Sequence, residues 1–364
     1  MSATTAPARG IRVTNTLTAG RLPRGTAWMV LGGCWVISAA FFALLAAAGA
    51  TDGFTVVGAV FAGTVLFDLI LYALSRIVEG RRRALDRLVT SLVATAFIIA
   101  LLPLISLIWT VLTNGLARFD LAFFSESMRN VVGDGGGALH AIVGTLLITG
   151  MATLISVPIG LLTSIYLVEY GRGVFAKAIT FLVDVMTGIP SIVAGLFTFA
   201  LFALILGPAV RNGFMGAVAL SVLMIPVVVR SSEEILRLVP NELREASYAL
   251  GVPKWLTILR IVLPTSLAGI VTGVMLAIAR VIGETAPLLL VTGFTFSMNY
   301  NLFDDRMMTL PVFVYTQYTQ AAGVSAQASI ERAWAAALTL ILIVMALNLL
   351  GRVIAKVFAP KRGL

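Results

Sequence analysis

The chain has 364 residues, of which 59% are hydrophobic and only 12% are charged, and its mean hydropathy is +1.00. This composition excludes an ordinary soluble protein, because about 20 apolar residues in a helix cross the hydrocarbon core of a bilayer and several stretches reach that length. A net charge of +9 would suggest a nucleic-acid partner in a soluble protein, but in a membrane protein the positions of the basic residues carry the information. We therefore expect an all-α integral membrane protein that contacts lipid and has no nucleic-acid partner.

Eight segments are candidate transmembrane helices. They are residues 27–50, 54–75, 88–112, 141–168, 178–206, 214–229, 265–294 and 333–357. The fifth is longer than a straight crossing needs, and the sequence GIPSIVAG at 188–195 predicts a break in it. A further apolar segment, MTLPVFVY at 308–315, is too short to cross a bilayer and is expected to be interfacial or re-entrant.

The first span does not fit a cleaved signal peptide. Residues 27–50 form a longer apolar run than the roughly 7–15 residues of a signal-peptide core, and a second span follows almost at once. We expect a retained transmembrane hairpin with its basic loop at 27–87, preceded by a disordered basic tail at 1–26. The only cysteine, Cys34, is expected to be a packing residue in this hairpin, and the only histidine, His140, excludes a metal site of several histidines.

Lys and Arg residues predict the direction of the chain. With both termini in the cytoplasm, twenty of these residues fall on the cytoplasmic side, one (Arg280) lies in a span, and five fall on the opposite side. The five are Arg118, Arg129, Arg211, Arg306 and Arg332. The bias predicts that the connection between the sixth and seventh spans, residues 231–264, is cytoplasmic, as is the C-terminal tail at 359–364.

The charged 231–264 connection is punctuated like a series of short helices. The stretch from Ser231 to Glu234 matches a capping box that would begin the first. Pro240 suits the first turn of the second helix, and Gly251 suits its left-handed C-terminal cap. Pro253 would begin a third helix that returns to the membrane.

The second of these helices has one apolar stripe, formed by Leu243, Ala246 and Leu250 at positions i, i+3 and i+7. Small residues beside the stripe, including Ser247, would let another surface approach the backbone closely. The pattern alone fits two arrangements. One is an ordinary amphipathic loop packed on its own bundle, and the other is a surface for a partner.

The same stretch resembles the EAA loop of ABC-importer permeases, in which Glu-Ala-Ala is followed after three residues by Gly and after nine more by Ile-x-Leu-Pro. The matching residues here are Glu245, Ala246, Ser247, Gly251, Ile261, Leu263 and Pro264. The one departure is Ser247, a small residue in place of the second alanine. The resemblance implies that these residues form a coupling helix that docks a cytoplasmic ATPase subunit. The chain has no G-x-x-x-x-G-K-[ST] sequence, so the ATPase would be a separate chain.

Two charges, Arg280 and Glu284, fall inside the seventh predicted span. Their i, i+4 spacing would put them on one face of a helix and within reach of each other. A charge at mid-membrane costs at least ~2.5–3.5 kcal/mol on insertion scales and normally faces a cavity or a partner. The pair therefore marks a candidate pathway, and the alternative is a structural ion pair that locks two helices. Gly283 and Pro287 would loosen the helix at this point.

Two more residues are candidates for an anion pathway. Arg230 lies at the cytoplasmic end of the sixth predicted span, and an arginine offers a rigid fork of donors to an oxyanion. Ser191, in GIPS, would begin a helix whose free N–H groups favour anions. A plain proline kink is the alternative at Ser191.

The combined pattern resembles the phosphate-uptake permeases of the PstA type. The supporting stretches are LVEYGRG (167–173), GIPSIVAGLF (188–197), the connection from 225 to 255, TGVMLAIARVIGETAPLLL (272–290) and NLLGRVI (348–354), and together they cover roughly residues 120–358. The resemblance implies a type I ABC-importer permease core at 88–358, with its transmembrane domain at about 138–350. Residues 1–87 lie outside the resemblance, and a hairpin beyond the usual six spans is a departure from the family.

The resemblance also implies the setting of the chain. It would form half of the translocation pathway of an ATP-driven inorganic phosphate importer in the bacterial inner or plasma membrane. Its partners would be a PstC-type permease subunit, a PstB-type ATPase dimer that holds ATP and magnesium, and an extracytoplasmic PstS-type phosphate-binding protein. The chain itself would carry no cofactor.

Other functions stay open from the residues. Sulfate, molybdate or phosphonate importers share the coupling loop. A stand-alone secondary transporter would require inverted repeats with paired broken helices, and only one convincing broken helix is found. No nucleophile with a base and no metal cluster is visible, and Asp68 and Asp184 stand alone in the sequence, so we expect a transporter subunit and not an enzyme.

Overall fold

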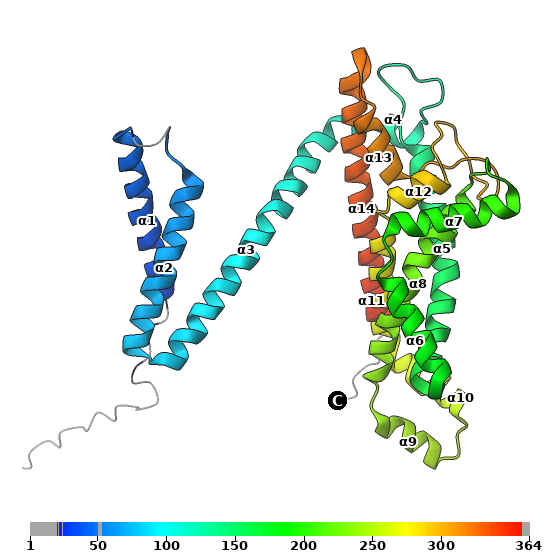
Figure 1. Ribbon diagram of the computed structural model, residues 1–364, viewed down its shortest axis with the longest axis horizontal. Coiled ribbons are helices and arrows are strands. Elements are labelled where there is room, and N and C mark those ends of the chain that lie inside the picture. Colours follow the sequence, from blue (N-terminus) through cyan, green and yellow to red (C-terminus); the bar gives the residue numbers. More distant parts are fainter. Residues whose placement is uncertain (1–19, 21, 24, 50–52, 359–364) are drawn as a thin grey trace, which may run out of the picture. The chain divides into compact units, whose positions relative to one another are not determined.

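The structure, a computed structural model, describes residues 20, 22–23, 25–49 and 53–358 (Figure 1). Every regular element among these residues is a helix, so the predicted all-α fold is confirmed. The predicted disordered tail at 1–26 lies almost entirely outside the described residues, and the tail at 359–364 lies wholly outside them. The chain divides into two compact units, residues 1–107 and 108–364.

The first unit is built on the predicted N-terminal hairpin. Its elements are α1 (Thr26–Ala47), α2 (Val56–Val78) and most of α3 (Arg81–Gly115). Gly63 of α2 lies so close to Trp35 of α1 that an added Cβ would be 2.7 Å from its ring. The hydroxyl of Ser38 donates to the carbonyl of Ala59 at 2.7 Å, which ties the two helices by a buried hydrogen bond. Cys34 is buried in this hairpin, as expected of a packing residue.

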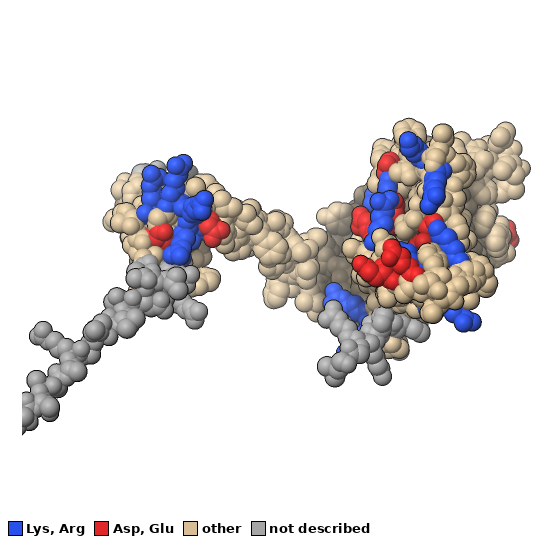
Figure 2. All heavy atoms as spheres, turned by 90° about the horizontal axis from the view of Figure 1, so that it is seen from below, with Lys and Arg blue, Asp and Glu red and all other residues tan. Residues whose placement is uncertain are grey.

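The α2–α3 junction is fixed by a buried carboxylate. Arg87 of α3 donates to Glu79 from Nε at 2.6 Å and from Nη2 at 2.9 Å, and the Ser75 hydroxyl and the Leu22 N–H donate as well. Burial alone would raise the pKa of Glu79, but these donors and the Arg87 charge outweigh burial and lower the pKa to about 2. Basic side chains gather around this end of the unit (Figure 2).

The second unit is a bundle around α8. Its elements are η1 (Leu116–Arg118), α4 (Leu121–Ser125), α5 (Leu139–Ile165), the π-helical turn η2 (Tyr166–Tyr170), α6 (Gly173–Thr187), α7 (Ser191–Leu206), α8 (Gly213–Arg237), α9 (Asn241–Ala249), α10 (Lys254–Thr257), the π-helical turn η3 (Ile258–Val262), α11 (Leu263–Val281), α12 (Ala286–Val291), α13 (Leu310–Thr319), η4 (Gly323–Ser325) and α14 (Ala326–Phe358). α8 packs against α5, α7 and α11, and 67% of its most apolar window is buried, the largest share of any candidate span. Met224 and Leu220 of α8 lie in the main core with Ile148 of α5.

The predicted number of spans agrees with the structure. In the described residues, seven helices are long and apolar enough to cross a membrane, and the bent pair α6–α7 makes eight. The two helices of that pair meet at 109°, and the break falls in the predicted GIPS sequence. α13 has ten residues and is too short to cross, as expected for the 308–315 segment.

Two predicted boundaries were wrong. No helix begins at the Ser231–Glu234 sequence, because α8 runs unbroken to Arg237 and the Ser231 hydroxyl donates to the Val227 carbonyl one turn earlier, at 2.9 Å. A serine that bonds its own helix in this way is compatible with a helix interior. The predicted seventh span at 265–294 is also not one helix. α11 ends at Val281 and α12 starts separately, since Pro287 has no N–H to continue the helix and its ring would clash with the carbonyl of Gly283.

Hydrogen bonds show which loops of the second unit lie at the same end of the bundle. The α8–α11 connection, residues 238–262, lies at the same end as the α5–α6 turn, because Arg244 bonds Glu169. At the other end, Arg118 and Arg332 both donate to carbonyls in the 133–136 turn. This grouping matches the division of basic residues by which the topology was predicted.

Candidate functional site

The α8–α11 connection forms one end of the second unit (Figure 1). α9 begins after Pro240 and ends in a Schellman cap, in which the N–H of Val252 bonds the carbonyl of Ser247 at 3.2 Å and the N–H of Gly251 bonds that of Tyr248 at 2.9 Å. Gly251 has φ +78, so the predicted left-handed cap is confirmed. α10 follows Pro253 and continues through η3 into α11, as predicted for the return to the membrane.

Several apolar side chains along α9 are exposed. Leu243 is 40% exposed, Tyr248 41% and Leu250 83%, and Glu245 and Ala246 are exposed beside them. Leu250 is therefore not packed on the bundle of its own chain, and the side of α9 opposite buried Ser247 carries the exposed Glu242 and Glu245. Clustered exposed apolar side chains rimmed by charge are typical of a docking surface. Figure 2 looks onto this end of the unit, where Lys and Arg lie interspersed with Asp and Glu.

The inner face of α9 is held by Ser247. This residue is 3% exposed, and its hydroxyl lies 2.8 Å from that of Thr257, which is fully buried at the end of α10. Thr257 also donates to the carbonyl of Pro253 at 3.3 Å. The serine that departs from Glu-Ala-Ala thus makes a buried hydrogen bond that alanine could not make.

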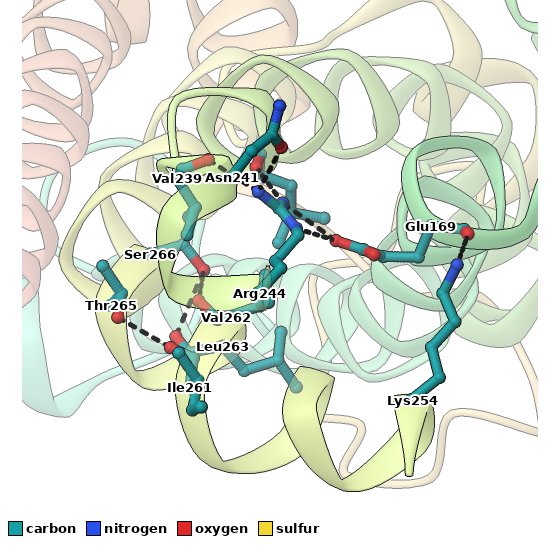
Figure 3. Close-up of polar contacts among 11 residues, drawn as sticks. Glu169, Val239, Asn241, Arg244, Lys254, Ile261, Val262, Leu263, Thr265 and Ser266 are labelled. Atoms are coloured by element: carbon teal, nitrogen blue, oxygen red, sulfur yellow. Dashed lines mark hydrogen bonds and ion pairs between the residues drawn. The ribbon is translucent and has the colours of Figure 1, made fainter. Parts of the chain in front are cut away.

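Arg244 fixes α9 to a second helix (Figure 3). Its Nε and Nη2 donate to one carboxylate oxygen of Glu169, in η2, at 3.0 and 2.9 Å. The same guanidinium donates to the carbonyls of Val239 at 2.6 Å and Leu236 at 3.0 Å, and to the Asn241 side chain at 3.3 Å. The side chains of Glu169 and Arg244 are only 5% and 12% exposed. This pair ties the end of α5 to the start of α9 and supplies donors to the last carbonyls of α8.

Lys254 reinforces the same junction. Its ammonium donates to the backbone carbonyl of Glu169 and lies 4.9 Å from the centre of the Tyr170 ring. That distance is within the range of a cation–π contact. The first residue of α10 is therefore attached to the same turn, η2, as α9.

Arg280 and Glu284 do not share a helix. Arg280 lies in the last turn of α11 and is exposed, whereas Glu284 is half-buried in the turn before α12. In the part of the chain that the structure describes, neither side chain forms a hydrogen bond or an ion pair. The expected pairing is thus not formed in this chain alone, and an exposed, unpaired arginine lies in a candidate membrane helix.

Arg230 lies in a charge-balanced network. It donates to Asp184 of α6 and, at 2.9 Å, to Glu233 of α8, and Glu233 also accepts from Arg237 at 2.6 Å. Asp184 is therefore not isolated, contrary to the expectation from the sequence. Two acids and two arginines balance, so little free positive charge remains on Arg230 for an anion.

The two arginines of the predicted pathway lie at different positions along the bundle. Gly273 of α11 packs against Ser231 of α8, with an added Cβ only 2.5 Å from the serine hydroxyl. Arg280 is seven residues further along α11, roughly 10 Å along the helix axis. Arg230 and Arg280 are therefore about two helical turns apart.

α7 begins at Ser191, as predicted, after Pro190. One turn on, Gly195 packs against Pro287 of α12, where an added Cβ would lie 2.7 Å from the proline Cα. The helix that starts at Ser191 is thereby joined to the helix that follows Glu284. Nearby, a groove of about 500 Å³ between α12 and α13 is lined by apolar residues, threonines and tyrosines. These are Thr285, Ala286, Leu289, Pro311, Val314, Tyr315, Tyr318 and Thr319. No cationic side chain lines it, so it offers no charged group to phosphate.

Sequence reasoning missed Glu169 and Thr257, which hold α9, and Asp184, which holds Arg230. Glu169 lies in LVEYGRG, one of the stretches that carry the family resemblance, but the resemblance did not identify a role for this residue. Among the described residues, no group of three or more His, Cys, Asp or Glu side chains could hold a metal ion.

Comparison with known proteins decides the family. Residues 156–363 match the family of binding-protein-dependent transport system inner membrane components. The chain is 47% identical to the phosphate transport system permease protein PstA 1 of Mycobacterium tuberculosis over 287 residues, which cover 78% of this chain and 92% of the relative. It is 48% identical to PstA of Mycobacterium leprae, over 76% of this chain and 90% of that protein. The chain belongs to the PstA-type family of phosphate ABC-transporter permeases.

A solved structure supports the fold. The crystal structure of a bacterial alginate ABC transporter in complex with an alginate-bound periplasmic protein contains a chain with a TM-score of 0.54 and 15% identity, covering 79% of this chain and all of that one. At this identity the likeness concerns the fold alone. The chain is thus a multi-pass membrane protein with an ABC-importer permease fold and a transport subunit, as its PstA relatives are named.

Proposed function

We propose that this chain is the permease subunit of an ATP-driven inorganic phosphate importer, that it forms half of the translocation pathway, and that it docks a separate ATPase through α9. The observation that carries the docking is the exposure of Leu243, Tyr248 and Leu250 on a helix that buried hydrogen bonds hold to the bundle. A helix that is held rigidly to the bundle and exposes apolar and acidic side chains suits a protein partner.

Glu245, Ala246, Ser247 and Gly251 take distinct parts in this docking helix. Glu245 and Ala246 are exposed and would touch the ATPase. Ser247 and Gly251 would set the angle of the helix, since one is buried against Thr257 and the other forms the left-handed cap.

Arg280 is our candidate for contact with passing phosphate. An exposed arginine without a partner in this chain is unfavourable against lipid, so it must face a water-filled cavity or the second permease subunit. Half-buried Glu284, in the following turn, would orient Arg280 and keep it from trapping the anion. A single guanidinium would bind phosphate only weakly, which suits a channel that must release the ion. Selectivity for phosphate would then belong to an extracytoplasmic phosphate-binding protein.

Arg230 and Ser191 take lesser parts in the proposed pathway. Arg230 shares its charge with Asp184 and Glu233, which favours a place at the inner end of the route, where phosphate is released. Ser191 starts a helix of 16 residues, whose first N–H groups would favour an anion nearby.

The remaining partners follow the same proposal. A PstC-type permease would complete the pathway, a PstB-type ATPase dimer would hold ATP and magnesium, and a PstS-type protein would deliver phosphate, while this chain carries no cofactor. The end with α9 would be cytoplasmic, in the bacterial inner or plasma membrane with both termini inside. In a Cys34→Ser background, a cysteine at 82 should resist an impermeant thiol reagent added outside, and labelling there would contradict this orientation.

Co-purification tests the docking directly. The chain is expressed with its PstC-type partner and a tagged ATPase, and Leu250→Asp is compared with Leu121→Asp, an equally open leucine (84% exposed) on α4, outside the candidate spans. Leu250→Asp should leave the chain in the membrane and reduce the ATPase recovered with it at least tenfold. Equal recovery of the ATPase with the wild type and Leu250→Asp would reject α9 as the docking site.

A further inference from the structure

α9 is attached to two different membrane helices by separate buried contacts. Arg244, near its start, bonds Glu169 at the end of α5, and Ser247, in its second half, bonds Thr257 at the start of the run into α11. The residues joined by the first contact are 75 positions apart in the sequence, and those joined by the second are ten apart. A helix held at two points along its length cannot turn or shift without moving both neighbours.

Both contacts end at irregular helical turns. Glu169 lies within the π-helical turn η2, and Thr257 immediately precedes the π-helical turn η3. A π-helical turn interrupts the regular ladder of hydrogen bonds, so the helix can change its direction there more easily than elsewhere. The two attachment points are thus also the points at which α5 and α11 can yield.

From this arrangement we propose that Glu169 and Thr257, acting through Arg244 and Ser247, are positioning residues that transmit a displacement of α9 to α5 and α11 together. This inference rests on the proposed function, since it requires that an ATPase moves α9. α5 leads on through η2 to the broken pair α6–α7, and α11 leads to Arg280. Both routes therefore end at residues of the proposed pathway.

The alternative is that the two contacts only stabilise the fold. Two features favour transmission. The guanidinium of Arg244 donates to Glu169 in η2, to Leu236 near the end of α8, and to Val239 and Asn241 at the start of α9. It therefore joins three elements at one point. Lys254 adds an attachment of α10 to the same turn, which makes the unit formed by α9 and α10 move as one body.

The experiment uses the complete importer in proteoliposomes, with this chain, its partner permease, the ATPase and the binding protein. Phosphate uptake and ATP hydrolysis are measured together, and their ratio is compared among variants. Glu169→Gln keeps the size of the side chain and removes its charge, and Ser247→Ala removes only the hydroxyl. The matched control is Glu331→Gln, which makes the same chemical change in a carboxylate bonded to Gln327 within α14.

Each variant should continue to hydrolyse ATP, and the ATPase recovered with each variant is measured so that the ratios are compared at equal ATPase content. The phosphate moved per ATP should fall about fivefold or more in Glu169→Gln and about twofold in Ser247→Ala, and Glu331→Gln should match the wild type. Arg244→Lys, which keeps the charge but loses the fork, should fall between Glu169→Gln and the wild type. The combination of Glu169→Gln with Ser247→Ala should be worse than either change.

Two results would overturn the proposal. One is a wild-type ratio in both Glu169→Gln and Ser247→Ala. The other is loss of Glu169→Gln from the membrane, which would give the Glu169–Arg244 pair a purely structural part. Failure of the docking proposal would appear differently, as undiminished ATPase recovery with Leu250→Asp. A complex that loses its ATPase in Leu250→Asp but keeps normal coupling in Glu169→Gln would reject transmission and leave the docking intact.

Discussion

Gly195 of α7 and Pro287 of α12 are in backbone contact, since a Cβ on the glycine would lie 2.7 Å from the proline Cα. The two residues come from the GIPSIVAG and GETAPLLL sequences, of which the first predicts a helix break and the second a loosened helix. Their contact shows that the broken pair α6–α7 and the turn with Glu284 form one structural unit. A movement of α7 therefore cannot leave α12 in place.

Gly195→Val should disrupt this contact. Overpacking of a close helix contact destabilises by about 1–3 kcal/mol, because side chains or backbone must move apart. We expect reduced phosphate uptake and a lower melting temperature of the purified chain. Gly150→Val is the matched control, since nothing lies within 4 Å of its added Cβ. Equal loss of stability in both variants would contradict a specific role for the contact.

Gly251→Val tests the cap of α9. Nothing lies within 4 Å of an added Cβ, so the effect comes from the backbone, whose φ of +78 is left-handed. A β-branched residue in this conformation is strained by roughly 1–2 kcal/mol, whereas asparagine tolerates it. We expect Gly251→Val to insert normally but to uncouple ATP hydrolysis from uptake, and Gly251→Asn to stay close to wild type. Identical uptake by Gly251→Val and wild type would show that the angle of α9 is not set by this cap.

Arg280 and Glu284 can be separated by single and double changes. Because their side chains are not paired in this chain, Arg280→Gln should abolish uptake while the complex still assembles, and Arg280→Gln with Glu284→Gln should stay inactive. Arg280→Lys should restore part of the activity, since it keeps the charge but not the fork. Phosphate uptake into membrane vesicles, measured for each variant at equal expression, distinguishes these outcomes. Recovery of transport in the double variant would assign the two residues a structural ion pair in the assembled complex.

The stability of the N-terminal unit should depend on pH through Glu79. Its pKa of about 2 in the fold is below the ~4.3 of an unfolded glutamate, so its contribution to stability is present above about pH 4 and is lost as the pH falls through 2. Glu79→Gln should therefore melt below wild type at pH 7, and the difference should shrink between pH 4 and pH 2. Melting followed by circular dichroism measures this, with Asp86→Asn, an exposed carboxylate on α3, as the control. A constant difference at all pH values would contradict the assigned role of Glu79.

Local sequence signals predicted the helices and their breaks well. Hydropathy placed the spans, the proline and glycine of GIPS placed the α6–α7 break, and Gly251 placed the left-handed cap. The errors arose where a local signal competed with a longer helix. Ser231 and Ser232 resemble a helix cap but lie inside α8. The apolar run from 265 to 294 continues across the point where Pro287 prevents one continuous helix.

The attachments of the site could not be predicted from the sequence. Glu169 and Arg244 are 75 residues apart, and Asp184 and Arg230 are 46 apart, so no periodicity joins them. Their pairing depends on which helices and turns pack side by side in the folded bundle. The i, i+4 spacing of Arg280 and Glu284 suggested a pair, but that spacing has its meaning only within an unbroken helix.

The most direct test of the account is phosphate uptake by the complete importer in proteoliposomes that hold ATP on the side of α9, with sulfate, molybdate or phosphonate as competitors. We expect phosphate to accumulate only when ATP is present. The competitors should leave this accumulation unchanged, and Leu250→Asp should abolish it. Uptake without ATP, or stronger uptake of another oxyanion than of phosphate, would contradict the account.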